Sequence, residues 1–191
     1  MAALPWPPSG RLDPEMAEAF AGAIARLRKQ GFKIEDVNPP RIFRQISDAI
    51  LELMAWEAAQ IHGERLDRYG DRMGRKLAEL IRRGIDTTEV VYNQSRQTIA
   101  EAVKAYESFS EKYPICLTPA APGAAPQGIQ STGDPRCNAP WTSIGAPAIS
   151  IRMAQAANRL PLGLQITAWK GRDALVLSVA AALEEALQTR S

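Results

Sequence analysis

The pattern of side chains changes abruptly at Pro114, and this change limits the fold more than any other feature of the sequence. From residue 41 to residue 113, apolar residues recur at the three- and four-residue spacing of helices. After Pro114 come a short apolar run at residues 115–118, a loop rich in proline and glycine at 119–140, and apolar segments near 148–152 and 162–168. Helices followed by short strands predict an α/β protein.

The two ends of the chain extend this prediction. Asp13-Pro14-Glu15 has the order of a helix start, and Gly31 is placed to end that helix. Residues 32–37 alternate apolar and polar side chains, as a short strand does, and residues 172–187 predict a closing helix. We expect one domain or part of a larger one, with about four short strands and a cover of helices. It divides into a helical region (41–113) and a strand-loop-strand-strand-helix segment (114–191).

Three glycines and one capping motif mark the expected breaks within the helical region. Gly63, Gly70 and Gly84 are the candidate break points, because glycine weakens a helix interior. Asp86-Thr87-Thr88-Glu89 resembles a capping box with Asp86 in the capping position. This motif predicts a new helix that begins just after Asp86.

The composition argues against several classes of partner. The net charge is +2, from 23 basic and 21 acidic residues, which gives no reason to expect a nucleic acid or an anionic membrane. No apolar run approaches the roughly 20 residues of a membrane span, and the N-terminus has no signal-peptide pattern, so we expect a cytoplasmic location. Cys116 and Cys137 form no metal motif, and we expect no metal and no cofactor. Cys116 is expected to pack as a small apolar residue, while a Cys116–Cys137 bridge stays open.

A search for catalytic groups assigns none. The single histidine, His62, is expected to cap a helix or pair with an acid, and any Ser-His-Asp site would depend on it alone. The sequence has no Gly-x-Ser-x-Gly elbow, no zinc spacing and no phosphate-binding glycine loop. Ser131-Thr132-Gly133 is isolated within the long loop. The lysines all fall at polar or solvated positions: Lys29, Lys33, Lys76, Lys104, Lys112 and Lys170.

Motifs in the last third of the chain resemble the amidase-signature family of serine amidohydrolases. They are Tyr113-Pro114-Ile115-Cys116-Leu117-Thr118-Pro119, Asn138-Ala139-Pro140-Trp141-Thr142 with Gly145-Ala146-Pro147-Ala148, and Leu160-Pro161-Leu162-Gly163-Leu164-Gln165-Ile166. Near the N-terminus, Leu4-Pro5-Trp6 resembles the stretch that follows a family strand. The order of these segments agrees with that family. The resemblance implies the C-terminal part of its fold, with residues 1–191 as one partial domain and a few strands of a mixed sheet covered by helices.

The resemblance also implies an activity, the hydrolysis of carboxamide C–N bonds through a serine acyl-enzyme. The family's two serines lie in a Gly/Ser-rich segment and its lysine lies upstream, and no such segment occurs in this sequence. We therefore expect the chain to supply sheet, helical cover and part of the acyl-pocket wall, and to be inactive alone. Residues 42–113 are expected to influence substrate size.

The residues expected to bind substrate are Trp141 and Thr142, together with the loop 119–138 as part of the pocket. The alternative for Trp141 is a place in the hydrophobic core. The alternative for Thr142 is likewise a structural role. Gln165 is expected to bond backbone rather than substrate. Gly145 is expected to set a turn, because glycine tolerates a positive φ.

Two alternatives remain for the function. In the first alternative, the chain is a non-catalytic partner or binding module of a split or degenerate amidase. In the second, it is an amidotransferase subunit of the same family. The expected partners are a small-molecule amide in the intact enzyme and a catalytic half. Self-association is also expected, because a half-sheet leaves an unpaired edge and an apolar face.

Overall fold

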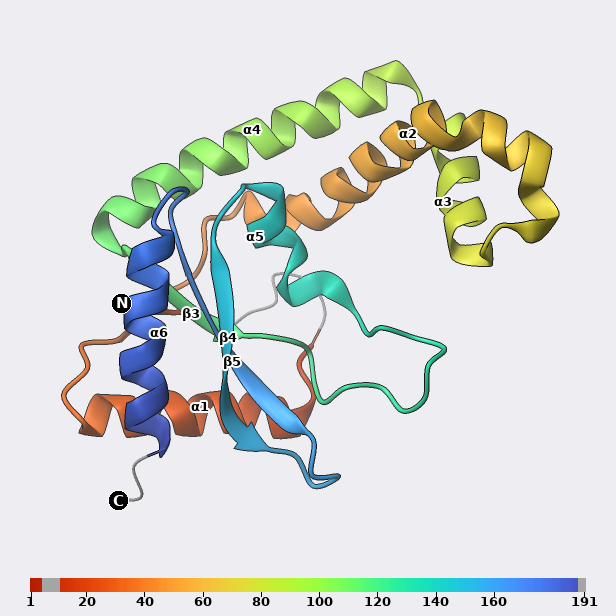
Figure 1. Ribbon diagram of the computed structural model, residues 1–191. Coiled ribbons are helices and arrows are strands. Elements are labelled where there is room, and N and C mark those ends of the chain that lie inside the picture. Colours follow the sequence, from red (N-terminus) through yellow and green to blue (C-terminus); the bar gives the residue numbers. More distant parts are fainter. Residues whose placement is uncertain (5–10, 189–191) are drawn as a thin grey trace.

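The computed structural model describes residues 1–4 and 11–188, and its centre is a mixed five-stranded sheet (Figure 1). The strand order is β2-β1-β3-β5-β4. β1 runs parallel to both β2 and β3, whereas β5 runs antiparallel to both β3 and β4. The strands are β1 (Ala2–Ala3), β2 (Glu35–Asp36), β3 (Ile115–Pro119), β4 (Ala148–Gln155) and β5 (Pro161–Ala168). Pro5 and Trp6 of the N-terminal motif lie outside the described residues.

The predicted fold class is confirmed, with two differences in the strands. The strand expected at residues 32–37 is reduced to Glu35–Asp36, because it pairs only with the two residues of β1. β1 itself was not expected, since two residues carry no periodic signal. It is held from both sides, by Glu35 on β2 and Cys116 on β3 opposite Ala2.

One face of the sheet carries a core shared with two helices. These are α1 (Pro14–Lys29) and α6 (Asp173–Gln188), and both contact β4 and β5. The buried side chains come from every third or fourth position of each helix, as the apolar periodicity predicts. They include Met16, Ile24 and Leu27 of α1 and Val176, Ala180 and Leu183 of α6.

The opposite face carries a second core, which is aromatic. It lies beneath α2 (Phe43–Tyr69), α4 (Glu89–Lys112) and the short helix α5 (Ala139–Ser143). The rings of Phe43, Tyr106 and Trp141 meet pairwise with centroids 5.4–5.8 Å apart. Cys116 and Cys137 belong to this core and are both free, so the bridge left open by the sequence is not formed.

The predicted helical region forms an arm that extends from the sheet. Figure 1 shows α2 and α4 running alongside each other, with α3 (Arg75–Asp86) packed against the far part of α2. Of the three expected break points, only Gly70 ends a helix. Gly63 lies within α2 and Gly84 within α3, so those two predictions were wrong.

The helix α4 starts two residues later than the capping motif predicts. Asp86 is the last residue of α3, and Thr88 is the residue that caps α4. The Thr88 hydroxyl accepts a hydrogen bond from the Val91 backbone N–H at 3.3 Å. The reason is tertiary, because α3 packs onto α2 through its final turn and keeps Asp86 helical.

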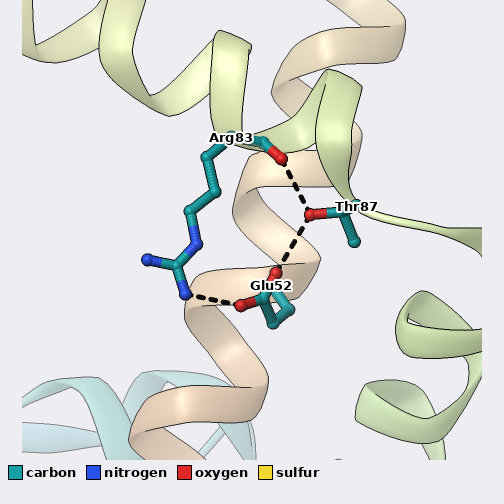
Figure 2. Close-up of polar contacts among 3 residues, drawn as sticks. All are labelled: Glu52, Arg83 and Thr87. Atoms are coloured by element: carbon teal, nitrogen blue, oxygen red, sulfur yellow. Dashed lines mark hydrogen bonds and ion pairs between the residues drawn. The ribbon is translucent and has the colours of Figure 1, made fainter.

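That final turn of α3 is tied to α2 by a polar cluster (Figure 2). The Glu52 carboxylate accepts from the Arg83 guanidinium at 2.5 Å and from the Thr87 hydroxyl at 3.0 Å. The Arg83 side chain holds the pKa of Glu52 below its ordinary value. The cluster therefore joins residues 31 positions apart and ties the end of α3 to α2.

Candidate functional site

An open cleft of about 800 Å³ lies where the long loop passes over the ends of β4 and β5. Its rim is formed by residues 120–126 and 132–135 of the loop, with Asn138 at the start of α5. Its floor is formed by Ser150, Arg152 and Gly163. A volume of this size is in the range that accommodates small-molecule ligands. The loop that the sequence predicts as pocket-forming therefore lines this cleft.

The loop is anchored to the start of α1. The Asp13 backbone N–H donates to the Pro122 carbonyl at 2.8 Å. The Asp13 carboxylate lies directly over Gly123, where a Cβ would come within 1.9 Å of Oδ2. Asp13 occupies the N-cap position of α1, as predicted, but its side chain makes no cap hydrogen bond. Its carboxylate packs against the loop instead, and only glycine at position 123 permits this contact.

The floor of the cleft depends on the absence of a side chain at Gly163. A Cβ there would come within 2.4 Å of the Ser150 Oγ and 2.9 Å of the Ala120 Cβ. Gly163 lies opposite Arg152, and Gln165 lies opposite Ser150, in the β4–β5 register. Because side chains alternate between the faces of a strand, these four positions share one face. Glycine at position 163 therefore leaves space between β4 and the loop.

A chain of three polar side chains leads from the interior of the sheet to this cleft. Thr118 is fully buried, and its hydroxyl donates to Oε1 of Gln165 at 3.1 Å. Gln165 is 5% exposed, and its Nε2 donates to Oδ1 of Asn138 at 2.6 Å. Asn138 is exposed and lines the cleft. The expectation that Gln165 bonds backbone was wrong, because both partners of its side-chain amide are side chains.

The charges around the cleft are unevenly paired. Asp134 on the rim accepts from the Arg136 guanidinium, with an Nε–Oδ2 distance of 2.8 Å, and this contact lowers the pKa of Asp134. Arg152 on the floor makes no ion pair with any described residue. The cleft thus presents a solvent-accessible guanidinium alongside the Asp13 carboxylate.

The two residues predicted to bind substrate lie next to the cleft and are not in its lining. Trp141 is 1% exposed and contacts Phe43 and Tyr106 beneath α5. Thr142 is exposed on the same helix. Asn138, three residues before Trp141, is the residue of this motif that reaches the cleft. Sequence reasoning missed Ser150 and Arg152, whose only signal is the alternation of polar and apolar residues along β4.

The remaining candidates for chemistry lie away from the cleft. His62 is within α2 and its Nδ1 lies 3.1 Å from the Arg65 guanidinium, so it neither caps a helix nor pairs with an acid there. None of the six lysines lines the cleft. Across residues 1–4 and 11–188, His, Cys, Asp and Glu side chains form no group that could hold a metal ion. No helix in the described ranges is long and apolar enough to cross a membrane.

Comparison with models of protein families shows to which family this chain belongs. The family model described as Amidase matches residues 3–177. This chain belongs to the amidase family. The match spans the end of β1 to the first part of α6, and therefore includes the cleft and most of both cores.

Individual relatives of this amidase-family chain show how much of an amidase it represents. It is 27% identical over 206 residues to a subunit of the glutamyl-tRNA(Gln) amidotransferase of Picosynechococcus sp., covering 92% of the chain and 42% of that protein. It is also 27% identical to 6-aminohexanoate-cyclic-dimer hydrolase of Paenarthrobacter ureafaciens, covering 92% and 41%.

Solved structures show the same proportion. A crystal structure of an amidase superposes with a TM-score of 0.85 at 22% identity, covering 96% of this chain and 44% of that one. At this identity the likeness shows the fold. The amidase-family chain therefore spans less than half the length of the relatives it matches, and the fold is shared over nearly all of that span.

Proposed function

We propose that this chain is the C-terminal portion of an amidase and forms one partial domain of it. In the intact enzyme, a carboxamide would be hydrolysed through a serine acyl-enzyme. This portion would supply strands, helical cover and one wall of the acyl pocket. The observation that carries the proposal is the combination of a family match over residues 3–177 with a ligand-sized cleft whose lining holds no lysine or histidine.

The chemistry of amide hydrolysis supports a separate source for the reacting groups. A serine nucleophile needs a base within hydrogen-bond reach and donors for the oxyanion. Ser150 lines the cleft, but its hydroxyl makes no hydrogen bond with any described residue, including the Asp13 and Asp134 carboxylates that line the same cleft. The cleft is therefore proposed to bind and orient the substrate, while a catalytic portion would cut the bond.

Trp141 and Thr142 keep a place in this proposal. Thr142 is exposed on α5 and is proposed to face the acyl pocket once the catalytic portion is present. Trp141 is proposed to act on substrate through α5, because it belongs to that helix, packs against Phe43, and so anchors the helix whose N-cap is Asn138. The two free, buried cysteines suit a reducing compartment, and we retain a cytoplasmic location as part of the proposal.

The experiment that tests the proposal is a turnover assay on the purified 191-residue chain. We expect no release of ammonia or amine from a panel of simple aliphatic and aromatic amides. Co-expression with the catalytic portion of a related amidase should restore turnover and labelling by a serine-directed probe. Turnover by the chain alone, with loss of activity on treatment with that probe, would overturn the proposal.

The alternatives differ in where the catalytic segment is encoded. A Gly/Ser-rich segment in frame upstream of Met1 would identify a portion of an ordinary amidase, whereas a separate reading frame would identify a split enzyme. Membership of an amidotransferase is a second candidate, because relatives of this chain are subunits of such enzymes. The net charge of +2 gives it little electrostatic support. Measurable tRNA binding by the chain would favour it.

A further inference from the structure

The polar chain from Thr118 to Asn138 has a direction, and that direction sets what the cleft presents to a ligand. The Thr118 hydroxyl donates to Gln165 Oε1. The Gln165 Oε1 is thereby turned to Thr118, and its Nε2 donates to Asn138 Oδ1. Because Oδ1 of Asn138 is turned to Gln165, its Nδ2 is the amide group of Asn138 that is left without a bond to a described residue and is offered to the cleft.

The position of Asn138 is fixed by its backbone as well. Its N–H donates to the Pro135 carbonyl at 2.8 Å, and its carbonyl accepts from the Trp141 and Thr142 N–H groups at 3.1 Å. Nδ2 makes no hydrogen bond with any described residue. A donor held by a nearly buried partner loses little conformational freedom when it binds, which favours affinity.

We propose that Asn138 is a binding residue that donates from Nδ2 to a planar acceptor oxygen of the ligand, with Gln165 and Thr118 as positioning residues. The ligand group is the carbonyl of an amide or the oxygen of a carboxylate. Gly163 leaves room for this group, because any side chain there would meet Ser150 and Ala120. Arg152, which lines the same floor without an ion pair to any described residue, strengthens binding when the oxygen is anionic.

This assignment rests on the proposed function only in taking the cleft as part of the acyl pocket. It is tested by binding to the purified chain, whereas the proposed function is tested by turnover. The probes are N-methylacetamide and acetate as acceptors, and methylammonium as a donor. The readout is the pair of side-chain NH₂ signals of Asn138 and Gln165 in a proton–nitrogen NMR spectrum, identified by their loss in Asn138→Asp and Gln165→Glu.

We expect both acceptor probes to move the Asn138 signal in a saturable way, and methylammonium to leave it unchanged. Asn138→Asp replaces the donor by an acceptor and should abolish binding of both acceptors. Asn93→Asp makes the same chemical change on α4, away from the cleft, and should not alter binding. If the site is built for a carboxylate, Arg152→Gln should weaken the binding of acetate at least about fivefold and the binding of N-methylacetamide little. If Arg152→Gln weakens the binding of both probes equally and only slightly, the site is built for an amide.

Two variants give a readout that a purely structural role would not move. In Gln165→Glu, the new carboxylate would accept from both the Thr118 hydroxyl and Asn138 Nδ2, which turns the Asn138 Oδ1 toward the cleft, and we expect methylammonium to bind better than either acceptor. Because the new charge by itself attracts methylammonium and repels acetate, Thr118→Val is the uncharged counterpart. With it, the preference for N-methylacetamide over methylammonium should narrow, because Gln165 is free to flip.

Three results would overturn the assignment. They are the absence of a saturable shift with either acceptor, equal binding of methylammonium by the unaltered chain, and an unchanged preference in Thr118→Val. Any of them combined with restored turnover on co-expression would leave the proposed function standing. Saturable binding without restored turnover would support the site and count against the proposed function.

Discussion

A single glycine, Gly84, decides how closely the two helices of the arm approach each other. It is buried in α3, and a Cβ at this position would lie 1.8 Å from the Ala55 carbonyl oxygen and 2.8 Å from the Ala59 Cβ. Ala55 and Ala59 are themselves small and buried on α2. The residue that the sequence marks as a helix break therefore serves a close helix–helix contact.

The variant Gly84→Ala should lower the free energy of unfolding by about 1–3 kcal/mol, because the backbone of α2 cannot yield without shifting the helix. Chemical denaturation of the purified chain measures this change. Gly63→Ala is the matched control, since Gly63 is also inside a helix but has nothing within 4 Å of its Cβ position. That control should gain about 0.5–1 kcal/mol from helix propensity. Equal effects of the two variants would contradict the packing role.

The two thiols of the aromatic core give a second prediction for single residues. Burial raises the pKa of Cys116 and that of Cys137 to about 12. At about pH 8 both are therefore protonated, and the protonated form is the unreactive one. A disulfide reagent that releases a coloured thiol should react slowly with the folded chain. After denaturation, the same reagent should react with both thiols. Rapid reaction of either thiol in the folded chain would contradict this.

At the scale of elements, the bend between α2 and α3 depends on an ion pair and a hydroxyl. The Glu52 side chain is 24% exposed and Arg83 48% exposed, so water screens much of their attraction. A pair of this kind contributes at most about 1 kcal/mol. Since Arg83 lowers the pKa of Glu52, the contribution is present above the ordinary carboxylate pKa and is lost as the pH falls through the lower folded value.

The variant Glu52→Gln should therefore be less stable than the unaltered chain near about pH 7, by up to about 1 kcal/mol. This difference in stability should shrink as the pH falls below about 4. Protonation of Glu52 in the unaltered chain then removes the charge that the variant lacks at every pH. Denaturation at a series of pH values measures it. Glu79→Gln is the control, because the Arg75–Glu79 pair is more exposed and joins residues of one helix. A Glu52→Gln difference independent of pH would contradict the argument.

At the scale of the whole molecule, the sheet ends on an eight-residue strand with a free edge among the described residues. β4 pairs with β5 on one side only, and its residues Ala148, Ser150 and Arg152 are exposed. The other edge is β2, which has two residues. An edge strand of this length is a template for pairing with another chain. The catalytic portion of the intact enzyme is the proposed partner, and a second copy is the alternative partner when the chain is alone.

We expect the purified chain to self-associate in a concentration-dependent way in sedimentation velocity. Ala148→Lys should reduce this association, because an exposed lysine on an edge strand disfavours edge pairing. Leu177→Lys adds the same charge on the exposed surface of α6, which covers one face of the sheet and does not pair with the edge of β4, and serves as the control. A monodisperse monomer at all concentrations would contradict the prediction. A larger effect of Leu177→Lys would place the contact on α6.

The sequence by itself determined the elements with strong periodicity and the family. Pro14 and the spacing of Met16, Ile24 and Leu27 were sufficient for α1, and the apolar segment at 148–152 was sufficient for the first part of β4. These signals are local, because they reflect propensity and amphipathic spacing along one segment. The motif Asn138-Ala139-Pro140-Trp141-Thr142 likewise indicated the family, which the match to residues 3–177 confirms.

Only the tertiary structure decided what depends on contacts between distant segments. The strand Ala2–Ala3 exists because β2 and β3 hold it, and Gly84 stays helical because Ala55 lies against it. The same holds for the cleft, where Asn138, Gln165 and Thr118 meet from three segments up to 47 residues apart. The direction of a side-chain amide is set by its partners in space, and no periodicity along the chain encodes those partners.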